Sequence, residues 1–291
     1  MKSKLLRSEM HAAFLFLIPV FVLYIIFVVS PAITTVYLSF TQFSGFDKPT
    51  WIGFENYHRV IGDPQTQKTL FNTLYFTAGT VFLSIISSLL LAVLLNQPLK
   101  GRALYRTIIY LPVVAPMLAV AFVWKFMFDS SPSGLINYLA SIFGIEAKQW
   151  LSDTRLAMPC VILVSVWKVL GYNMVIFLAG LQGIPSQIYE AAEIDGAGFF
   201  QKFFNVTIPL LKPVTTFVFI TSTINAFQAF EQIYGMTSGG PANSTYTLAY
   251  LIYVKGFRSL KFGEASALAV ILVLVVLMFS MFYIKDVAKE K

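Results

Sequence analysis

The sequence predicts an all-α, polytopic membrane protein with six transmembrane helices. The composition points there first: 57% of the residues are hydrophobic and only 12% are charged, whereas about a quarter of a soluble domain is charged. The hydrophobic residues also gather in long runs, and about 20 helical residues cross a hydrocarbon core of about 30 Å. The expected spans lie approximately at residues 12–29, 74–95, 107–128, 157–180, 214–230 and 265–284.

The composition also excludes several kinds of site. The net charge is +7, but it is spread over loops and termini, and nucleic-acid binding needs a continuous basic surface. Cys160 is the only cysteine, so an intrachain disulfide and a cysteine-cluster metal site are both excluded. His11 and His58 are too few and too far apart in sequence to indicate a metal site. We expect neither a catalytic nor a metal site in this chain.

The six spans differ in quality. The first follows a basic, signal-like start, but no clear cleavage site ends it, so we expect a retained span. The second and sixth contain no charged residue. The fifth, 214–230, carries Thr, Ser, Asn and Gln side chains throughout, so it should not face lipid on all sides.

The distribution of basic residues predicts the orientation. Lys and Arg are denser in the segments that are cytoplasmic when both termini lie inside, although Lys255, Arg258 and Lys261 oppose this bias. We therefore expect a multi-pass protein of a bacterial or archaeal cytoplasmic membrane, with cytoplasmic N- and C-termini. Its outer segments would be residues 30–73, 129–156 and 231–264.

Each outer segment has a recognisable pattern. The first contains WIGFENYHRVIGD, whose Gly, Asn and aromatic residues predict a folded cap. The second, which includes SPSGLINYLASIFG at 131–144, predicts a turn followed by a short interfacial helix. The third carries TSGGPANST, a Gly-Pro turn after which helix resumes over 246–257.

The most informative segment is residues 183–213, GIPSQIYEAAEIDGAGFFQKFFNVTIPLLKP. Pro185 and Ser186 are typical of a helix start, the Ser as a cap, and a short helix is expected over about 187–195. Gly196 and Gly198 interrupt it. A second helix would carry four Phe on one face and end at two prolines; those residues are Phe199, Phe200, Phe203, Phe204, Pro209 and Pro213. By pattern alone this is also compatible with an ordinary loop between membrane helices.

The order of residues in this segment favours a more specific interpretation. Tyr189-Glu190-Ala191-Ala192, Asp195-Gly196-Ala197 and Ile208-Pro209-Leu210 resemble the EAA loop of permease subunits in binding-protein-dependent ABC importers, most closely the maltose-type, carbohydrate-uptake branch. The resemblance runs from about residue 70 to the end and includes residues 95–128, 133–137, 165–185 and 237–245. It implies the type I ABC importer permease architecture, one permease domain over 1–291, and a cytoplasmic coupling loop at 183–213.

The resemblance also implies partners. These are a second, related permease forming a heterodimer, two cytoplasmic ABC ATPase subunits, an extracytoplasmic solute-binding protein and the lipid bilayer. The sequence has no GxxxxGK loop followed by Ser or Thr, so we expect no cofactor on this chain, with ATP and Mg²⁺ at the ATPase subunits. The coupling residues would be Glu190, Ala191, Ala192, Asp195, Gly196, Ile208 and Pro209.

A saccharide needs amides, hydroxyls and aromatic faces. Ser222, Asn225 and Gln228 supply them at i, i+3 and i+6 on one stripe of the fifth span, and Tyr172 and Asn173 add to them from the fourth. Hydrogen bonding between helices explains such residues equally well one by one. In the maltose-type family the corresponding span lines the sugar site, but Ala226 and Ala229 stand where that comparison would put amides, so the pocket should differ.

Lys168 falls near the middle of the fourth span, where a charge costs at least about 2.5 kcal/mol. It should face a water-filled cavity or a partner such as Glu231, unless the span is shifted so that the ammonium reaches the headgroups. We favour a neutral sugar or oligosaccharide as the solute. Lys168 leaves a charged derivative, such as glycerol phosphate or a uronate oligomer, as the alternative.

The turn at Gly239, Gly240 and Pro241 is the candidate contact for the binding protein. Two other classes of protein remain as alternatives. An ATPase-independent secondary transporter predicts acidic residues within spans and inverted repeats, and the confident spans contain neither Asp nor Glu. A membrane scaffold leaves the polar fifth span unexplained.

Overall fold

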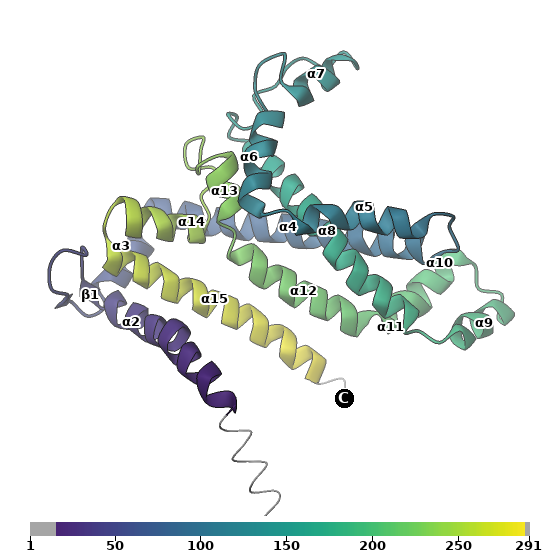
Figure 1. Cartoon of the computed structure of the whole chain (residues 1–291), viewed down its shortest axis with the longest axis horizontal. Helices are drawn as coiled ribbons and strands as arrows, with labels where there is room; N and C mark the ends of the chain where they lie inside the picture. Colours follow the sequence, from purple (N-terminus) through teal and green to yellow (C-terminus); the bar gives the residue numbers. More distant parts are fainter. Residues whose placement is uncertain (1–15, 289–291) are drawn as a thin grey trace, which may run out of the picture. The chain divides into compact units, whose positions relative to one another are not determined.

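The computed structural model describes residues 16–288, and they are mostly helical (Figure 1). The chain divides into two compact units, one of residues 1–63 with 252–271 and one of residues 64–251 with 272–291. Four described helices are long and apolar enough to cross a membrane, and the number rises to six if each of two bent helix pairs forms one span. The six predicted spans correspond to this upper number.

The first unit begins with the predicted first span. Its helix runs without a gap over Phe16–Ser39 and includes a π-helical turn, η1 (Ile25–Val29), before α2 (Ser30–Ser39). Pro31 lies in the first turn of α2, and a proline ring clashes with the carbonyl four residues earlier, which explains why the helix widens just before it. The helix ends ten residues beyond the predicted limit, and residues 12–15 of the prediction lie outside the described part.

The predicted cap after this span is folded. Strands β1 (Thr41–Gln42) and β2 (Thr50–Trp51) pair antiparallel, with Thr41 opposite Trp51, and α3 (Glu55–Gly62) follows. The buried Asn56 amide donates to the carbonyls of Ser39 at 3.0 Å and Thr41 at 2.8 Å. These bonds connect α3 to the end of α2 and account for the Asn in the cap sequence.

The first unit also contains η3 (Val254–Arg258) and the start of α15 (Phe262–Ala288). The Lys255 ammonium lies 2.8 Å from a Glu264 carboxylate oxygen and 3.4 Å from one of Asp63. Burial alone would lower the pKa of Lys255, but hydrogen bonding and attraction from Glu264 and Asp63 outweigh it, so that pKa is raised. Lys255 therefore belongs to an ion-pair network, which accounts for a basic residue that opposed the predicted charge bias.

The second unit is organised around two long helices, α4 (Pro64–Asn96) and α8 (Ala157–Gln182). Helix α4 begins ten residues before the predicted span, and a proline suits its first turn. Around this pair lie α5 (Arg102–Val114), α6 (Met117–Met127), α7 (Leu135–Ser141), α12 (Lys212–Phe227), α13 (Glu231–Met236) and α14 (Leu248–Tyr253), whose last two residues belong to the first unit. Helix α7 is the short helix predicted after the turn at 129–134.

The predicted third span, 107–128, is bent rather than continuous. Helices α5 and α6 meet at 99°. Ala115 between them is extended, with φ −69° and ψ 140°, because the ring of Pro116 disfavours the helical conformation in the residue before it. The fifth span is also shorter than predicted, since α12 ends at Phe227 and Phe230 has left helical geometry.

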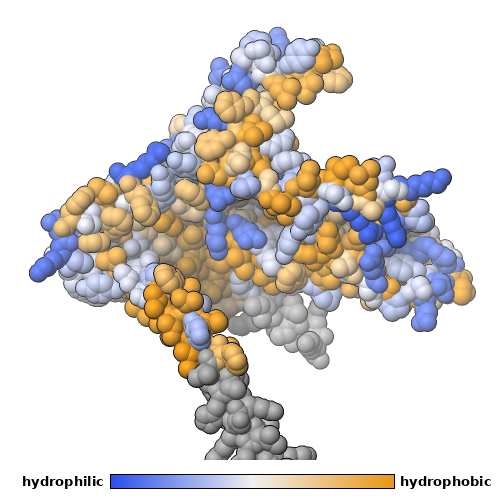
Figure 2. Space-filling view, in the orientation of Figure 1, coloured by the Kyte–Doolittle hydropathy of each residue, from blue (hydrophilic) through white to orange (hydrophobic). Residues whose placement is uncertain are grey.

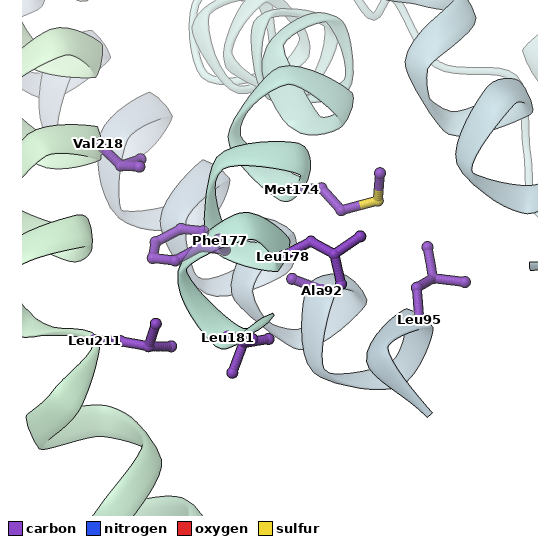
Figure 3. Packing of buried hydrophobic residues seen from close by; sticks show 8 residues of the cluster. All are labelled: Ala92, Leu95, Met174, Phe177, Leu178, Leu181, Leu211 and Val218. Carbon is purple, nitrogen blue, oxygen red and sulfur yellow. The ribbon is translucent and has the colours of Figure 1, made fainter. Parts of the chain in front are cut away.

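A hydrophobic cluster joins α4, α8 and the start of α12 (Figure 3). Phe177 and Leu181 point from α8 toward Leu211 and Val218 on one side, and Ala92 lies on the α4 side. Burial from lipid adds no hydrophobic gain of the kind found in water, so close packing holds such helices together. The cluster consists of Ala92, Leu95, Met174, Phe177, Leu178, Leu181, Leu211 and Val218.

Candidate functional site: a polar cavity and a coupling segment

A cavity of about 270 Å³ lies within the second unit. This volume is near the lower end of the roughly 300–1,000 Å³ of typical ligand pockets. Its walls come from α4, α5, α6, α8, α12 and α13 and mix hydroxyls, amides, one tyrosine and aliphatic groups. They are Phe76, Thr80, Ser84, Val113, Met117, Ser165, Lys168, Val169, Tyr172, Asn173, Thr221, Ser222, Asn225, Ala226 and Gln232.

Most of the predicted path residues meet in this cavity, which brings together Lys168, Tyr172, Asn173, Ser222 and Asn225. Gln228 and Glu231 are exposed and do not line it. The i, i+6 spacing that placed Gln228 on the same stripe assumed a continuous helix, but α12 ends one residue before it. The fifth span therefore contributes to the cavity only from within α12, and the fourth span contributes Ser165 and Val169 in addition to the residues predicted.

The Lys168 ammonium is held at the break between α5 and α6. It donates to the carbonyl oxygens of Pro112 at 2.9 Å and Val113 at 2.8 Å. The last carbonyls of a helix have no intrahelical partner, and within a membrane such groups must be satisfied by the protein itself. Lys168 thus satisfies two carbonyls that the bend leaves free. It lines the cavity, as one of the predicted arrangements required, and it bonds to these carbonyls rather than to Glu231.

Close backbone contact positions this bend. A Cβ on Gly171 would lie 2.4 Å from the Ile109 carbonyl oxygen and 2.7 Å from Cα of Tyr110. Only glycine permits helices to approach so closely. Gly171 therefore brings α5 near enough to α8 for Lys168, one turn earlier, to reach the α5 terminus.

A hydrogen bond crosses from α8 to α12 at the cavity wall. The Asn173 amide nitrogen donates to Ser222 Oγ at 3.3 Å. This is the helix–helix bond that offered the alternative explanation for such residues. Both residues also line the cavity, so the same pair joins two walls and presents polar atoms to the space between them.

The coupling segment has the predicted helix, glycine and helix order. Helix α9 (Ser186–Ile194) has Asp195 as its C-cap residue, and Gly196, which follows, adopts φ 79°. Gly196 N–H donates to the Glu193 carbonyl and Ala197 N–H to that of Ala192, which is a Schellman C-cap with glycine in the left-handed position. The predicted Ser186 cap is absent: the helix begins after Pro185 without a side-chain cap bond.

The second helix runs from Phe199 to Leu210 as α10 (Phe199–Lys202), a π-helical turn η2 (Phe203–Thr207) and α11 (Ile208–Leu210). It does not end at Pro209, which lies in the first turn of α11, and it bends by 65° into α12. Ile208 and Pro209 are exposed. Leu211, at the bend, is buried in the hydrophobic cluster and anchors the segment to α8.

Two polar pairs hold α9 against this second helix. The hydroxyls of Tyr189 and Thr207 share a hydrogen bond of 3.0 Å, and Lys202 forms an ion pair with Glu193. At 100° per residue this leaves Ala191 and Ile194 on the opposite face and Glu190 on the flank beside them. All three are exposed, and Ile194 is 87% exposed. Ala192 is half-buried and Asp195 exposed.

Four phenylalanines on one face could fix the second helix on the spans, but three of them do not. Phe199, Phe200 and Phe204 are exposed, Phe200 by 73%. The rings pack on one another instead, one pair stacked and two edge-to-face, with centroids 5.1–6.5 Å apart. Figure 2 shows hydrophilic groups gathered around α9 and α10 with apolar patches among them, and a largely apolar surface along α5.

Close packing and hydrogen bonds hold the turn at Gly239, Gly240 and Pro241, the GGP turn. Gly239 is buried with φ 81°, and a Cβ there would lie 2.4 Å from the Tyr246 ring. Thr245 Oγ1 donates to the Gly240 carbonyl at 2.8 Å, and Pro241 is half-buried. The exposed tip is formed by the next two residues, Ala242 and Asn243, whose carbonyls accept bonds from Lys68 and Asn72 of α4.

Residues 81–290 match the model of the binding-protein-dependent transport system inner membrane component. The chain belongs to this family.

Two relatives illustrate the match. The trehalose/maltose transport system permease protein MalF of Thermococcus litoralis is 34% identical over 285 residues, which cover 97% of this chain and 96% of the relative. The sn-glycerol-3-phosphate transport system permease protein UgpA of Brucella suis biovar 1 is 36% identical over 277 residues, 94% of each.

A bacterial ABC transporter involved in the import of the acidic polysaccharide alginate shares the fold, with a TM-score of 0.84 at 23% identity and coverage of 98% and 99%. This protein is therefore a multi-pass ABC importer permease.

Sequence reasoning missed one wall of this permease's cavity. Thr80 and Ser84 line the cavity from α4, whose span we had noted only for its lack of charged residues. Thr80 Oγ1 is buried without a hydrogen-bond partner among the described residues. The signal was present, because hydroxyl residues recur in α4 at helical spacing. They stand at Thr69, Thr73, Thr77, Thr80, Ser84 and Ser88.

Proposed function

We propose that this permease forms half of the translocation path for a sugar or oligosaccharide, delivered by an extracytoplasmic binding protein and driven by ATP. The observation that carries the proposal is the lining of the cavity. Hydroxyls of Thr80 and Ser222, the amides of Asn225 and Gln232 and the ring of Tyr172 surround one space. Saccharides are bound by polar groups of this kind together with aromatic faces.

The names of the relatives support a sugar or sugar-like solute, but they differ in the solute they name. One is named for trehalose and maltose and another for sn-glycerol-3-phosphate. Ala226, where the family comparison would put an amide, lines the cavity as a small side chain. The precise saccharide should therefore differ from that of maltose-type relatives.

The energy would enter through α9. Its outer face presents Glu190, Ala191 and Ile194, and the small Ala191 permits close approach of an ATPase subunit. The Schellman cap at Gly196 and the pairs to the second helix make α9 a stiff unit rather than a flexible loop. A push on α9 would pass through Leu211 to α8 and α12, both of which line the cavity.

The proposed assembly contains a second, related permease, two ATPases and the binding protein. ATP and Mg²⁺ would bind at the ATPases, and this chain would hold no cofactor and catalyse no hydrolysis. The EAA segment and both termini would face the cytoplasm. Gly239 was predicted to contact the binding protein but is buried. The binding protein would therefore contact the exposed tip beside Pro241, which is formed by Ala242 and Asn243.

The test is purification of the tagged chain in mild detergent, followed by reconstitution into liposomes with the binding protein. The proposal expects an ATPase and a second permease in the purified complex and ATP-dependent uptake of the saccharide extracted from the binding protein. A chain that purifies alone and transports down a proton or Na⁺ gradient would be a secondary transporter. A complex that moves no solute would be a scaffold.

A further inference from the structure

The cavity carries one cation and no carboxylate. Among the residues that line it, Lys168 is the basic one, and neither Asp nor Glu occurs. The remaining polar walls are hydroxyls and amides, which are uncharged. Glu231, which does not line the cavity, attracts the ammonium through space. No acidic side chain of the lining pairs with it, so a solute in this space meets its positive charge.

The structure holds the ammonium in place without using all of its capacity. Two of its hydrogen bonds go to Pro112 and Val113, and an ammonium has three donors. Both acceptors belong to the C-terminal turn of α5, where the helix dipole favours a cation. Lys168 is thus fixed by neutral carbonyls, and one N–H remains for a ligand in the cavity.

A second unpaired group lies in the same walls. Thr80 lines the cavity from α4 and is 7% exposed, and its buried Oγ1 has no hydrogen-bond partner among the described residues. A buried hydroxyl without a partner costs free energy unless a ligand or water satisfies it. The cavity therefore offers one charged donor from α8 and one free hydroxyl from α4.

Building on the proposed function, we propose that the solute is an anionic saccharide, whose carboxylate or phosphate oxygen accepts a hydrogen bond from Lys168 while a ring hydroxyl bonds to Thr80. Charge-assisted hydrogen bonds are the strong ones, and the low-dielectric surroundings strengthen them further. This revises the neutral saccharide that the sequence alone favoured.

The competing explanation is that Lys168 serves only as the cap of α5. The variant Lys168→Gln separates the two, because the Gln amide keeps an N–H donor for the carbonyls but removes the charge. Lys168→Arg keeps the charge. Lys125→Gln is the matched control, since Lys125 is an exposed lysine of α6 outside the cavity.

The experiment measures equilibrium binding to the complete, purified importer without its binding protein. The probes are radiolabelled digalacturonate and its neutral counterpart galactobiose, with glucose 1-phosphate and glucose as a second pair that separates phosphate from carboxylate. We expect the anionic member of at least one pair to bind roughly tenfold or more tightly to the wild type, about the factor that one charge-assisted bond supplies.

Lys168→Gln should abolish that preference, whereas Lys168→Arg and Lys125→Gln should keep it. If Lys168→Gln weakens the binding of both members of a pair equally, Lys168 acts only as the cap of α5. That result would overturn the inference. Tighter binding of the neutral members to the wild type would also overturn it and leave the sugar permease standing. Binding of none of the four probes would count against both proposals.

Discussion

The cavity and the coupling segment use polar and apolar groups in opposite ways. In the cavity, residues with hydroxyl and amide groups line a space between six helices. In the coupling segment, the polar groups are paired with each other, and apolar side chains such as Ile194 and Phe200 remain exposed. One region has free polar groups inside, and the other has free apolar groups outside.

This difference indicates what each region should bind. The cavity is lined by six helices of this chain, and its unsatisfied groups can be met by a small solute. The coupling segment is stiff but uncovered, and a cluster of exposed apolar side chains rimmed by polar ones marks a protein interface. The two regions should therefore respond differently to substitution.

The largest effect should come from the contact on which the cavity wall depends. Gly171→Ala would put a Cβ 2.4 Å from the Ile109 carbonyl oxygen, so α5 must move away from α8 and Lys168 must release its bonds. We expect a loss of about 3 kcal/mol, the upper end for overpacked cores, visible as a lower unfolding temperature of the purified permease. Gly183→Ala is the control, since its Cβ would meet nothing nearer than 3.4 Å, and equal stability of the two variants would contradict the account.

The second-largest effect should be on the binding of the ATPase to α9, with no effect on folding. Ala191→Arg adds a long side chain to the exposed face of α9, and the folded chain has room for it. We expect the ATPase to bind roughly thirtyfold or more weakly, which corresponds to an interface hot spot of about 2 kcal/mol. Asn205→Arg, exposed in the same segment but off α9, should leave ATPase affinity near the wild-type value.

A smaller effect is expected inside the cavity. Thr80→Val keeps the shape of the side chain but removes the free hydroxyl. The half-saturating solute concentration for uptake should rise about tenfold, because one hydrogen bond of about 1–1.5 kcal/mol is lost, while ATPase binding stays normal. Ser87→Ala, at a half-buried serine of α4 that does not line the cavity, is the control, and similar uptake by both variants would remove Thr80 from the path.

The smallest effect should follow from the ion pair behind α9. Glu193→Gln removes the charge partner of Lys202, but the Glu193 side chain is 61% exposed. Pairs of this kind contribute about 0–1 kcal/mol, so ATPase binding and uptake should change less than about threefold. A loss as large as that of Ala191→Arg would mean that the stiffness of α9 depends on this pair.

Much of the fold followed from the sequence because it depends on local signals. Hydrophobic run length located the spans, and the glycine at 196 marked the end of α9 because only a left-handed residue completes its cap. The residues predicted for the cavity from α8 were found there, since that helix is continuous.

The features that the sequence did not predict depend on where helices end inside hydrophobic runs. Pro116 interrupts α5–α6, and α12 ends before Gln228, yet neither break lowers the hydropathy that predicted a span. The role of Lys168 required both the α5 terminus and the Gly171 contact. Thr80 was hidden because hydroxyl residues at helical spacing in an apolar helix also occur as ordinary packing.

The most direct test of the account is ATP-dependent uptake by the reconstituted importer carrying Ala191→Arg, with the saccharide taken from its own binding protein. The account predicts that uptake and solute-stimulated ATP hydrolysis are both lost, while equilibrium binding of the saccharide to the cavity remains at the wild-type level. Uptake and stimulated hydrolysis at wild-type rates would contradict the claim that α9 drives the cavity.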